Sequence, residues 1–133
     1  MKEIKVEIRA QSDIIVARRA GRDMARDLGF GSADQTRLAT AISELTRNII
    51  QYAGEGVCVI TDESDKTTIK VRVKVEDNGP GIPDIDQVME QGFSTARGLG
   101  AGLPGTKRLV QEFDIDSVPG HTIVIIAITQ RKV

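Results

Sequence analysis

Asp77 stands at the end of an alternating stretch and is followed by two glycines, Gly79 and Gly81. The alternation places Asp77 on the apolar face of a predicted strand, where burial of an unpaired carboxylate costs several kcal/mol. A carboxylate only accepts hydrogen bonds, and glycines without a Cβ atom allow a flat ligand to lie against the backbone. An exocyclic amino group such as that of adenine fits this combination, although an ordinary Asn-Gly turn would use the same residues.

A second polar pair, Glu44 and Asn48, is separated by four positions within a stretch that predicts a helix. Residues at this spacing lie on one flank of a helix, so a carboxylate and a carboxamide stand together beside the apolar stripe. Taken alone, the pair also fits two polar residues at the border of the core.

A third motif is the glycine-rich run Gly98–Leu103, in which Gly98, Gly100 and Gly102 alternate before a helix predicted over about residues 104–113. The free N–H groups of such a loop and the positive end of the helix dipole both favour an anion. The run therefore indicates a phosphate-binding loop, and a glycine loop that is merely mobile is the alternative.

Periodicity along the chain predicts the elements that must position these residues. Alternation predicts a strand at residues 4–8, a hairpin of 57–61 with 68–76, and an almost wholly apolar central strand at 121–128. Helical spacing predicts a helix with Ser12 as its N-cap that ends before Gly29, and a second from Ser32 or Asp34 to about Ala53. A short helix is also predicted at 83–89.

Composition sets the limits of function. The chain has 133 residues, 40% of them apolar and 28% charged, and a formal net charge of -1, which predicts one domain over residues 1–133 and no footprint for nucleic acid or an anionic membrane. No apolar run could span a bilayer, so we expect a cytoplasmic protein. The single cysteine, Cys58, is typical of a small buried hydrophobe, and the single histidine, His121, excludes a histidine metal cage.

In this order and spacing, the three motifs together with Thr122 resemble the GHKL ATPases, which include gyrase, Hsp90 chaperones, histidine kinases and MutL. The resemblance implies an α/β sandwich, in which ATP lies between a mixed sheet and helices that cover one face. It makes Asn48 the Mg²⁺ ligand and Glu44 the general base of the reaction. It also makes Asp77 the acceptor for adenine and Thr122 a supporting hydroxyl near the adenine base. It also implies that Arg97 neutralises charge on the phosphate. The remaining nucleotide contacts that it implies are Gly79, Gly81, Ile82, Ser94, Thr95, Gly98, Leu99, Gly100, Ala101, Gly102 and Leu103.

Within this family, the length and the run Phe93–Leu109 followed by Phe113–Ser117 are most similar to the stressosome switch kinases. This resemblance implies a kinase that phosphorylates STAS-domain scaffold proteins on serine or threonine and, once released, activates a phosphatase partner. An anti-sigma-factor kinase, which sequesters a sigma factor and phosphorylates its antagonist, is the alternative. A nucleotide-gated binding module is a second alternative, but such a module needs neither Glu44 nor Asn48, and the presence of both favours catalysis.

Overall fold

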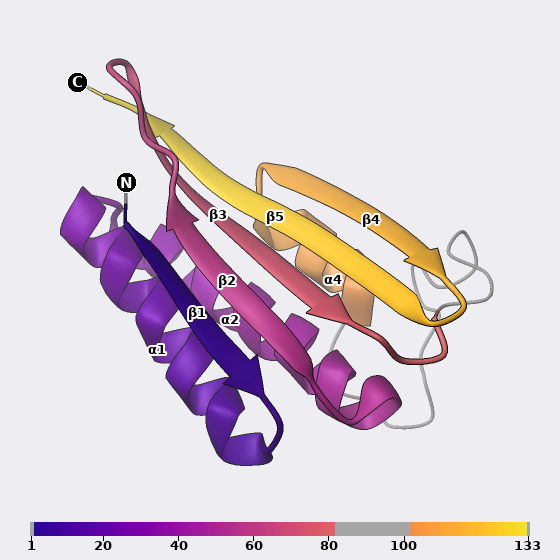
Figure 1. Cartoon of the computed structure of the whole chain (residues 1–133). Helices are drawn as coiled ribbons and strands as arrows, with labels where there is room; N and C mark the ends of the chain where they lie inside the picture. The colour runs from indigo at the N-terminus through magenta and orange to yellow at the C-terminus, as the bar shows by residue number, and fades with distance from the viewer. Residues whose placement is uncertain (1, 82–101, 133) are drawn as a thin grey trace.

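Five strands form one sheet in the order β1-β2-β3-β5-β4, and each neighbouring pair is antiparallel (Figure 1). This computed structural model describes residues 2–81 and 102–132. The strands are β1 (Glu3–Ile8), β2 (Gly56–Asp62), β3 (Thr68–Asp77), β4 (Glu112–Val118) and β5 (His121–Arg131).

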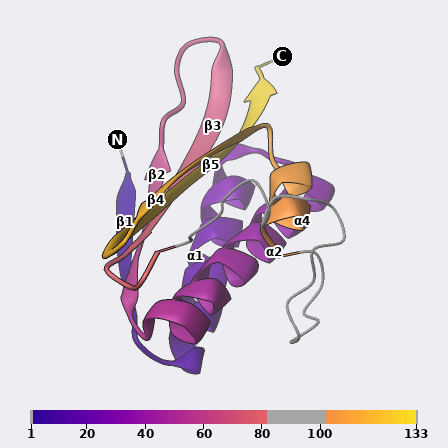
Figure 2. The same ribbon diagram turned by 90° about the vertical axis from the view of Figure 1, so that its right-hand side faces the viewer.

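The helices lie in one layer against one face of this sheet, as the turned view in Figure 2 shows. They are α1 (Gln11–Leu28), α2 (Ser32–Asn48) and α4 (Gly102–Leu109), and a short π-helix, η1 (Ile49–Ala53), continues α2. Helix α1 packs against α2, and α2 packs against α4. The other face of the sheet is left without helices among the described residues.

The core lies between the two layers. Val71, Val73 and Val75 of β3 are buried, whereas Lys70, Arg72 and Lys74 between them are only half-buried, as alternation in a one-sided sheet requires. Helix α2 contributes the buried residues Leu38, Ile42 and Leu45 to this core. Full burial of one such aliphatic side chain is worth about 1.5–3 kcal/mol, so the sheet–helix interface is a main source of stability.

The predicted fold class, an α/β sandwich with helices on one face, is confirmed. The implied mixed sheet is wrong for the described strands, since all four pairings are antiparallel. The reason is the order of the strands. Strands β1, β3 and β4 run in one direction, and β2 and β5, which run in the other, lie between them, so no two strands of the same direction pair.

The strands predicted at 4–8, 57–61, 68–76 and 121–128 are confirmed as β1, β2, β3 and β5. Strand β5 is central but is not equally buried on both faces, because Val124, Ile126 and Ile128 are buried whereas Ile123 and Ile125 are half-buried. Cys58 is confirmed as a buried hydrophobe with no exposed surface, and desolvation raises the pKa of its thiol to about 12.

Two helix boundaries differ from the predictions. The N-cap of α1 is Ala10, not Ser12, and Asp13 Oδ2 accepts the backbone N–H groups of Arg9 and Ala10 at 2.8 and 3.0 Å instead. The helix predicted to reach Phe113 ends at Leu109, because period-two alternation from Glu112 onward forms β4. The second helix reaches Ala53 as predicted, although its last part, Ile49–Ala53, is the π-helix η1. The helix predicted at 83–89 lies outside the described residues.

Candidate active site

Four residues from four strands form a row at one end of the sheet. In this row Gly56 pairs with Asp77, Asp77 with Thr122, and Thr122 with Ser117. Paired residues of antiparallel strands point to the same face, and Asp77 continues the parity of the buried valines of β3. The row therefore sets a carboxylate and two hydroxyl groups next to one another on the helix-covered face.

Asp77 sits at the centre of this row and is half-buried. Its Oδ1 accepts the backbone N–H of Gly79 at 2.9 Å, which closes an Asx turn at the end of β3. An ionised carboxylate has about four acceptor positions, so this bond leaves capacity for a ligand. The carboxylate is thus held in place by the chain itself.

Gly56 lies one residue before the strand predicted at 57–61, yet it belongs to β2 and makes room for Asp77. A Cβ atom on Gly56 would lie 2.5 Å from the backbone oxygen of Glu76 and 3.2 Å from Asp77 Cβ. Ile49 of η1 approaches the same point, at 2.9 Å. A glycine inside a strand often marks such a close approach, and this signal was available in the sequence.

Gly79 and Gly81 are required by the packing of their own loop. A Cβ on Gly79 would lie 2.6 Å from Ala53 Cβ, at the end of η1. Gly81 has φ +84°, a conformation that L side chains rarely adopt, and a Cβ there would lie 2.5 Å from the backbone oxygen of Val118. The loop is therefore fixed between η1 and the end of β4.

Glu44 and Asn48 lie one turn apart on α2, as predicted, and both are only partly exposed. The Glu44 side chain, which is 18% exposed, accepts a hydrogen bond from Arg47 Nη1 at 2.9 Å. Sequence reasoning missed Arg47, although its position three residues after Glu44 was a signal for an ion pair. A carboxylate, a guanidinium and a carboxamide are thus grouped at the end of α2.

The π-helix η1 connects this group to the strand row. It begins directly after Asn48, and its residues Ile49 and Ala53 are the ones that approach Gly56 and Gly79. Single π turns within α-helices are frequent at functional sites. The structure therefore brings the predicted pair Glu44 and Asn48 and the predicted residues Asp77, Gly79, Gly81 and Thr122 to the same end of the fold.

Several predicted site residues lie outside the described residues, namely Ile82, Ser94, Thr95, Arg97, Gly98, Leu99, Gly100 and Ala101. Gly102 is described, with φ +58°, and opens α4, where its carbonyl accepts the Thr106 hydroxyl at 2.9 Å. Leu103 is 5% exposed and its side chain belongs to the hydrophobic core.

Within residues 2–81 and 102–132, no three His, Cys, Asp or Glu side chains come together, so these residues provide no complete ligand set for a metal ion. His121 Nε2 and Glu76 Oε2 are 2.5 Å apart, next to Asp77 in sequence but on the opposite face of the sheet. An Asn48 carbonyl could still bind Mg²⁺, because this ion needs few protein ligands when phosphate oxygens and water supply the rest.

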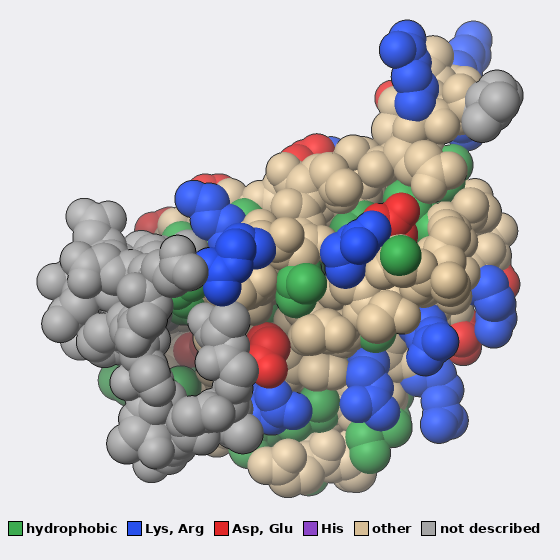
Figure 3. Space-filling model, turned by 180° about the vertical axis from the view of Figure 1, so that it is seen from behind, with side chains coloured by type: hydrophobic (Ala, Val, Ile, Leu, Met, Phe, Trp, Pro, Cys, Tyr) green, Lys and Arg blue, Asp and Glu red, His purple; other side chains and the backbone are tan. Residues whose placement is uncertain are grey.

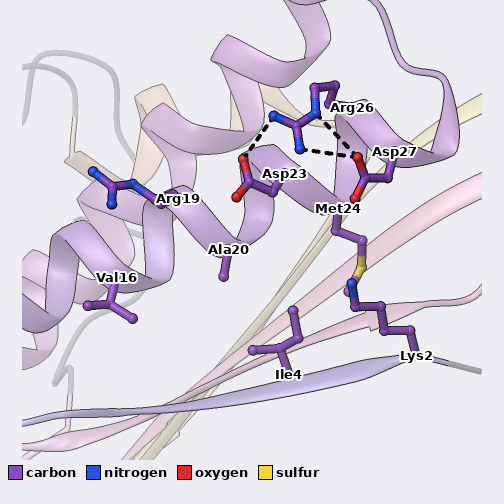
Figure 4. A pocket seen from close by; sticks show the side chains of 9 residues that line it. All are labelled: Lys2, Ile4, Val16, Arg19, Ala20, Asp23, Met24, Arg26 and Asp27. Atoms are coloured by element: carbon purple, nitrogen blue, oxygen red, sulfur yellow. Dashed lines mark hydrogen bonds and ion pairs between the residues drawn. The ribbon is translucent and has the colours of Figure 1, made fainter.

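Basic side chains gather over α1 on the helix-covered side of the molecule (Figure 3). The exposed arginines of this helix are Arg18, Arg19, Arg22 and Arg26. A shallow groove of about 420 Å³ runs between α1 and β1, with Ile4 and Met24 among its lining residues and Arg26 bonded to Asp23 and Asp27 at its rim (Figure 4). Ile4 pairs with Ile60 whereas Ile8 pairs with Gly56, so this groove is at the far end of β1 from the Asp77 row.

None of the helices in the described part of the chain combines the length and the hydropathy that a membrane crossing requires.

Known proteins are similar to this chain both in sequence and in fold. Residues 33–131 match the family described as histidine kinase-, DNA gyrase B-, and HSP90-like ATPase. The chain is 54% identical over 123 residues to the serine/threonine-protein kinase RsbT of Bacillus subtilis (strain 168), with 92% of each chain covered.

Two solved structures show the same fold. The RsbU and RsbW domains of Rv1364c from Mycobacterium tuberculosis match 98% of this chain and 33% of theirs, with a TM-score of 0.66 and 17% identity. A chain of the SiaB-SiaC complex from Pseudomonas aeruginosa matches 98% of this chain and 90% of its own, with a TM-score of 0.61 and 14% identity. The resemblance to the GHKL ATPases is thereby confirmed: the chain belongs to the histidine kinase-, DNA gyrase B- and HSP90-like ATPase family and is a protein-serine/threonine kinase that uses ATP.

Proposed function

We propose that this kinase transfers the γ-phosphate of ATP to a serine or threonine of a STAS-domain scaffold protein and that the Asp77 end of the fold is its active site. The observation that carries the proposal is the junction at η1, which begins directly after Asn48 of α2 and packs through Ala53 against Gly79 in the loop that follows Asp77. The family and the relative RsbT support an ATP-using protein kinase; the STAS-domain substrate comes from the similarity of the 93–117 stretch to stressosome switch kinases.

The nucleotide base is recognised by the strand row in this proposal. Asp77 accepts hydrogen bonds from the exocyclic amino group of adenine, and Thr122 provides a hydroxyl beside it. We assign the contacts along the flat face of the base to Gly79, Gly81 and Ile82. Only this end of the sheet combines, within the described residues, an inward carboxylate with glycines that approach the backbone so closely.

The phosphates are held by the second half of the chain. We assign this role to Ser94, Thr95 and Arg97 and to the run from Gly98 to Leu103, whose backbone N–H groups and following helix α4 suit an anion. Because the Leu103 side chain is in the core, its contribution is that of its backbone. Asn48 holds Mg²⁺, which when bound supplies positive charge to the phosphate oxygens.

Glu44 acts as the general base. It takes the proton of the substrate hydroxyl as the hydroxyl oxygen bonds to the γ-phosphorus, and the bond from that phosphorus to the bridging oxygen of ADP breaks. Glu44 Oε1 is bonded to Arg47, so the carboxylate keeps a fixed orientation on α2. After transfer, the kinase leaves its phosphorylated scaffold and binds a phosphatase partner.

Labelled ATP with Mg²⁺ and a STAS-domain protein, followed by mass spectrometry, tests this function. Label should appear on a serine or threonine, and Glu44→Gln should reduce the transfer rate by about 10²- to 10⁴-fold while ADP binding is retained. Glu55→Gln is the matched control, since Glu55 is exposed and does not belong to the group of Glu44, Arg47 and Asn48 at the end of α2. Asn48→Ala should also abolish transfer and spare most scaffold binding. If a sigma factor co-elutes stoichiometrically and no STAS-domain protein is labelled, the anti-sigma-factor alternative replaces this proposal.

A further inference from the structure

The outermost member of the strand row, Ser117, touches the predicted adenine contact Thr122. Their Oγ and Oγ1 atoms are 2.6 Å apart, a short hydrogen bond between two hydroxyl groups in which either can be the donor. Ser117 and Thr122 are also a cross-strand pair, close to the turn that joins β4 to β5. The strand register therefore fixes this contact, because the next-to-last pair of a tight hairpin cannot slip independently of the turn.

Thr122 has little freedom to satisfy its hydroxyl elsewhere. It is 8% exposed and lies between Asp77 on one side and Ser117 on the other. A hydroxyl group carries one proton and accepts through its lone pairs. If Ser117 donates to Thr122, the Thr122 proton is left for another acceptor on the Asp77 side of the row.

Which of the two hydroxyl groups is the donor determines which nucleotide base the row can bind. Adenine presents an amino group beside an acceptor ring nitrogen, N1, whereas guanine presents an acceptor oxygen beside an N1–H donor. A row with an accepting Asp77 and a donating Thr122 matches adenine at both positions and guanine at neither. If Thr122 donated its proton to Ser117 instead, the hydrogen bond from Thr122 to N1 of adenine would be lost.

We propose that Ser117 is a positioning residue that sets base specificity: by donating to Thr122 it directs the Thr122 proton toward N1 of adenine. The inference rests on the proposed adenine site at Asp77 and extends it to a residue of the edge strand β4. Ser117 itself does not touch the nucleotide in this arrangement.

A pair of nucleotides that differ only at N1 tests the inference. ADP and 1-deaza-ADP, in which N1 is replaced by C–H, are titrated calorimetrically into wild type, Ser117→Ala and Ser117→Thr. Wild type should prefer ADP over the analogue. Ser117→Ala removes the donor that orients the Thr122 hydroxyl, which can then turn its proton toward the Asp77 carboxylate instead of N1, so the preference should fall by about three- to tenfold, the range that one hydrogen bond supports. Ser117→Thr keeps the hydroxyl and should restore the preference. Ser12→Ala, on exposed helix surface, is the control and should leave it unchanged.

The ratio of the two dissociation constants separates positioning from folding, because a general loss of stability weakens both nucleotides alike. A Ser117→Ala ratio equal to that of wild type overturns the inference while leaving the adenine site intact. If instead the wild type binds ADP no better than Asp77→Asn does, the proposed adenine site is wrong and the inference fails with it. Thr122→Val should show the same reduced ratio, and adding Ser117→Ala to it should change nothing further.

Discussion

The carboxylate of Asp77 is the residue on which the proposed base recognition depends most. Its neighbours fix its position but take only part of its hydrogen-bonding capacity, since Gly79 N–H is bonded to Oδ1 alone. An amide in the same place presents one acceptor and one donor, and the donor would face the amino group of adenine. The site thus depends on the charge and the acceptor character of this side chain, and not only on its shape.

We therefore expect Asp77→Asn to weaken ADP binding by roughly 1.5–3 kcal/mol, the worth of a hydrogen bond to a charged group. Calorimetric titration of the purified chain measures this directly. Asp114→Asn makes the same chemical change on the exposed side of β4 and should leave the affinity unchanged. Equal affinities of Asp77→Asn and wild type would contradict the adenine assignment.

The hydrogen bond between Glu44 and Arg47 is a feature of the site that the sequence did not predict. The spacing of Glu44 and Asn48 predicted that they share a flank of a helix, and the structure agrees. The same spacing could not say that Glu44 bonds to Arg47 in the structure, because that choice depends on side-chain rotamers and on the partial burial of both groups. Arg47 is a candidate member of the site that only the structure revealed.

Among the elements, those with clear periodicity were predicted well and the short ones at the site were not. The alternation of β3 and the apolar run of β5 predicted both strands to within a few residues at each end. Strand β4 was missed because Leu109, Val110 and Phe113 also fit a helical stripe, and only the pairing with β5 decides between the two periods. The π turn of η1 has no simple sequence signature and was predicted as ordinary helix.

The junction of β2, β3 and η1 was the least predictable part of the site. Gly56 lets these three elements meet, and its importance depends on a register that only the folded sheet defines. A Cβ atom there would meet the backbone of β3, which cannot move aside as a flexible side chain could.

Gly56→Ala should therefore lower the free energy of unfolding by about 1–3 kcal/mol, the cost of overpacking. It should also weaken ADP binding, because Asp77 must shift. Urea denaturation and calorimetry measure the two effects. Gly31→Ala is the matched control, because apart from its chain neighbours no heavy atom lies within 4 Å of a Cβ placed there. If both variants unfold at the same urea concentration, the close approach at Gly56 does not constrain the fold.

At the scale of the whole molecule, one hydrophobic cluster draws residues from α1, α2, α4 and from strands β1, β2, β3 and β5. We propose on this basis that residues 1–133 fold as a single domain. Cys58 reports on that core, because its thiol is buried at the middle of β2 and its pKa is raised from 9.0 to about 12 by desolvation. Its reaction with a thiol reagent should thus coincide with loss of helical circular dichroism in urea, and an earlier thiol reaction would contradict cooperative unfolding.

The same thiol predicts a pH dependence. The unfolded chain ionises Cys58 above about pH 9 whereas the folded chain keeps it protonated to about pH 12, so its contribution to stability is complete below pH 9 and is lost as pH rises between these values. At about pH 10.5 this loss is about 2 kcal/mol. Cys58→Ala should show a correspondingly smaller fall in unfolding free energy between pH 8 and that pH. Parallel falls in the two proteins would show that other groups control alkaline unfolding.

The last prediction concerns the proposed cycle of the kinase with its scaffold. Phosphorylation adds about -1.5 to -2 charges to the scaffold at the docking surface, and the kinase itself has a formal net charge of -1. If the phosphate faces carboxylates there, like-charge repulsion weakens the complex and releases the kinase for its second partner. Affinity for the phosphorylated scaffold should therefore be lower than for the unmodified one, and the difference should shrink at high salt, where the Debye length falls to about 3 Å. A scaffold whose target residue is replaced by alanine should remain bound in Mg·ATP. Binding that is tighter after phosphorylation would instead direct attention to the arginines of α1 as the phosphate's partners, and release by repulsion would be excluded.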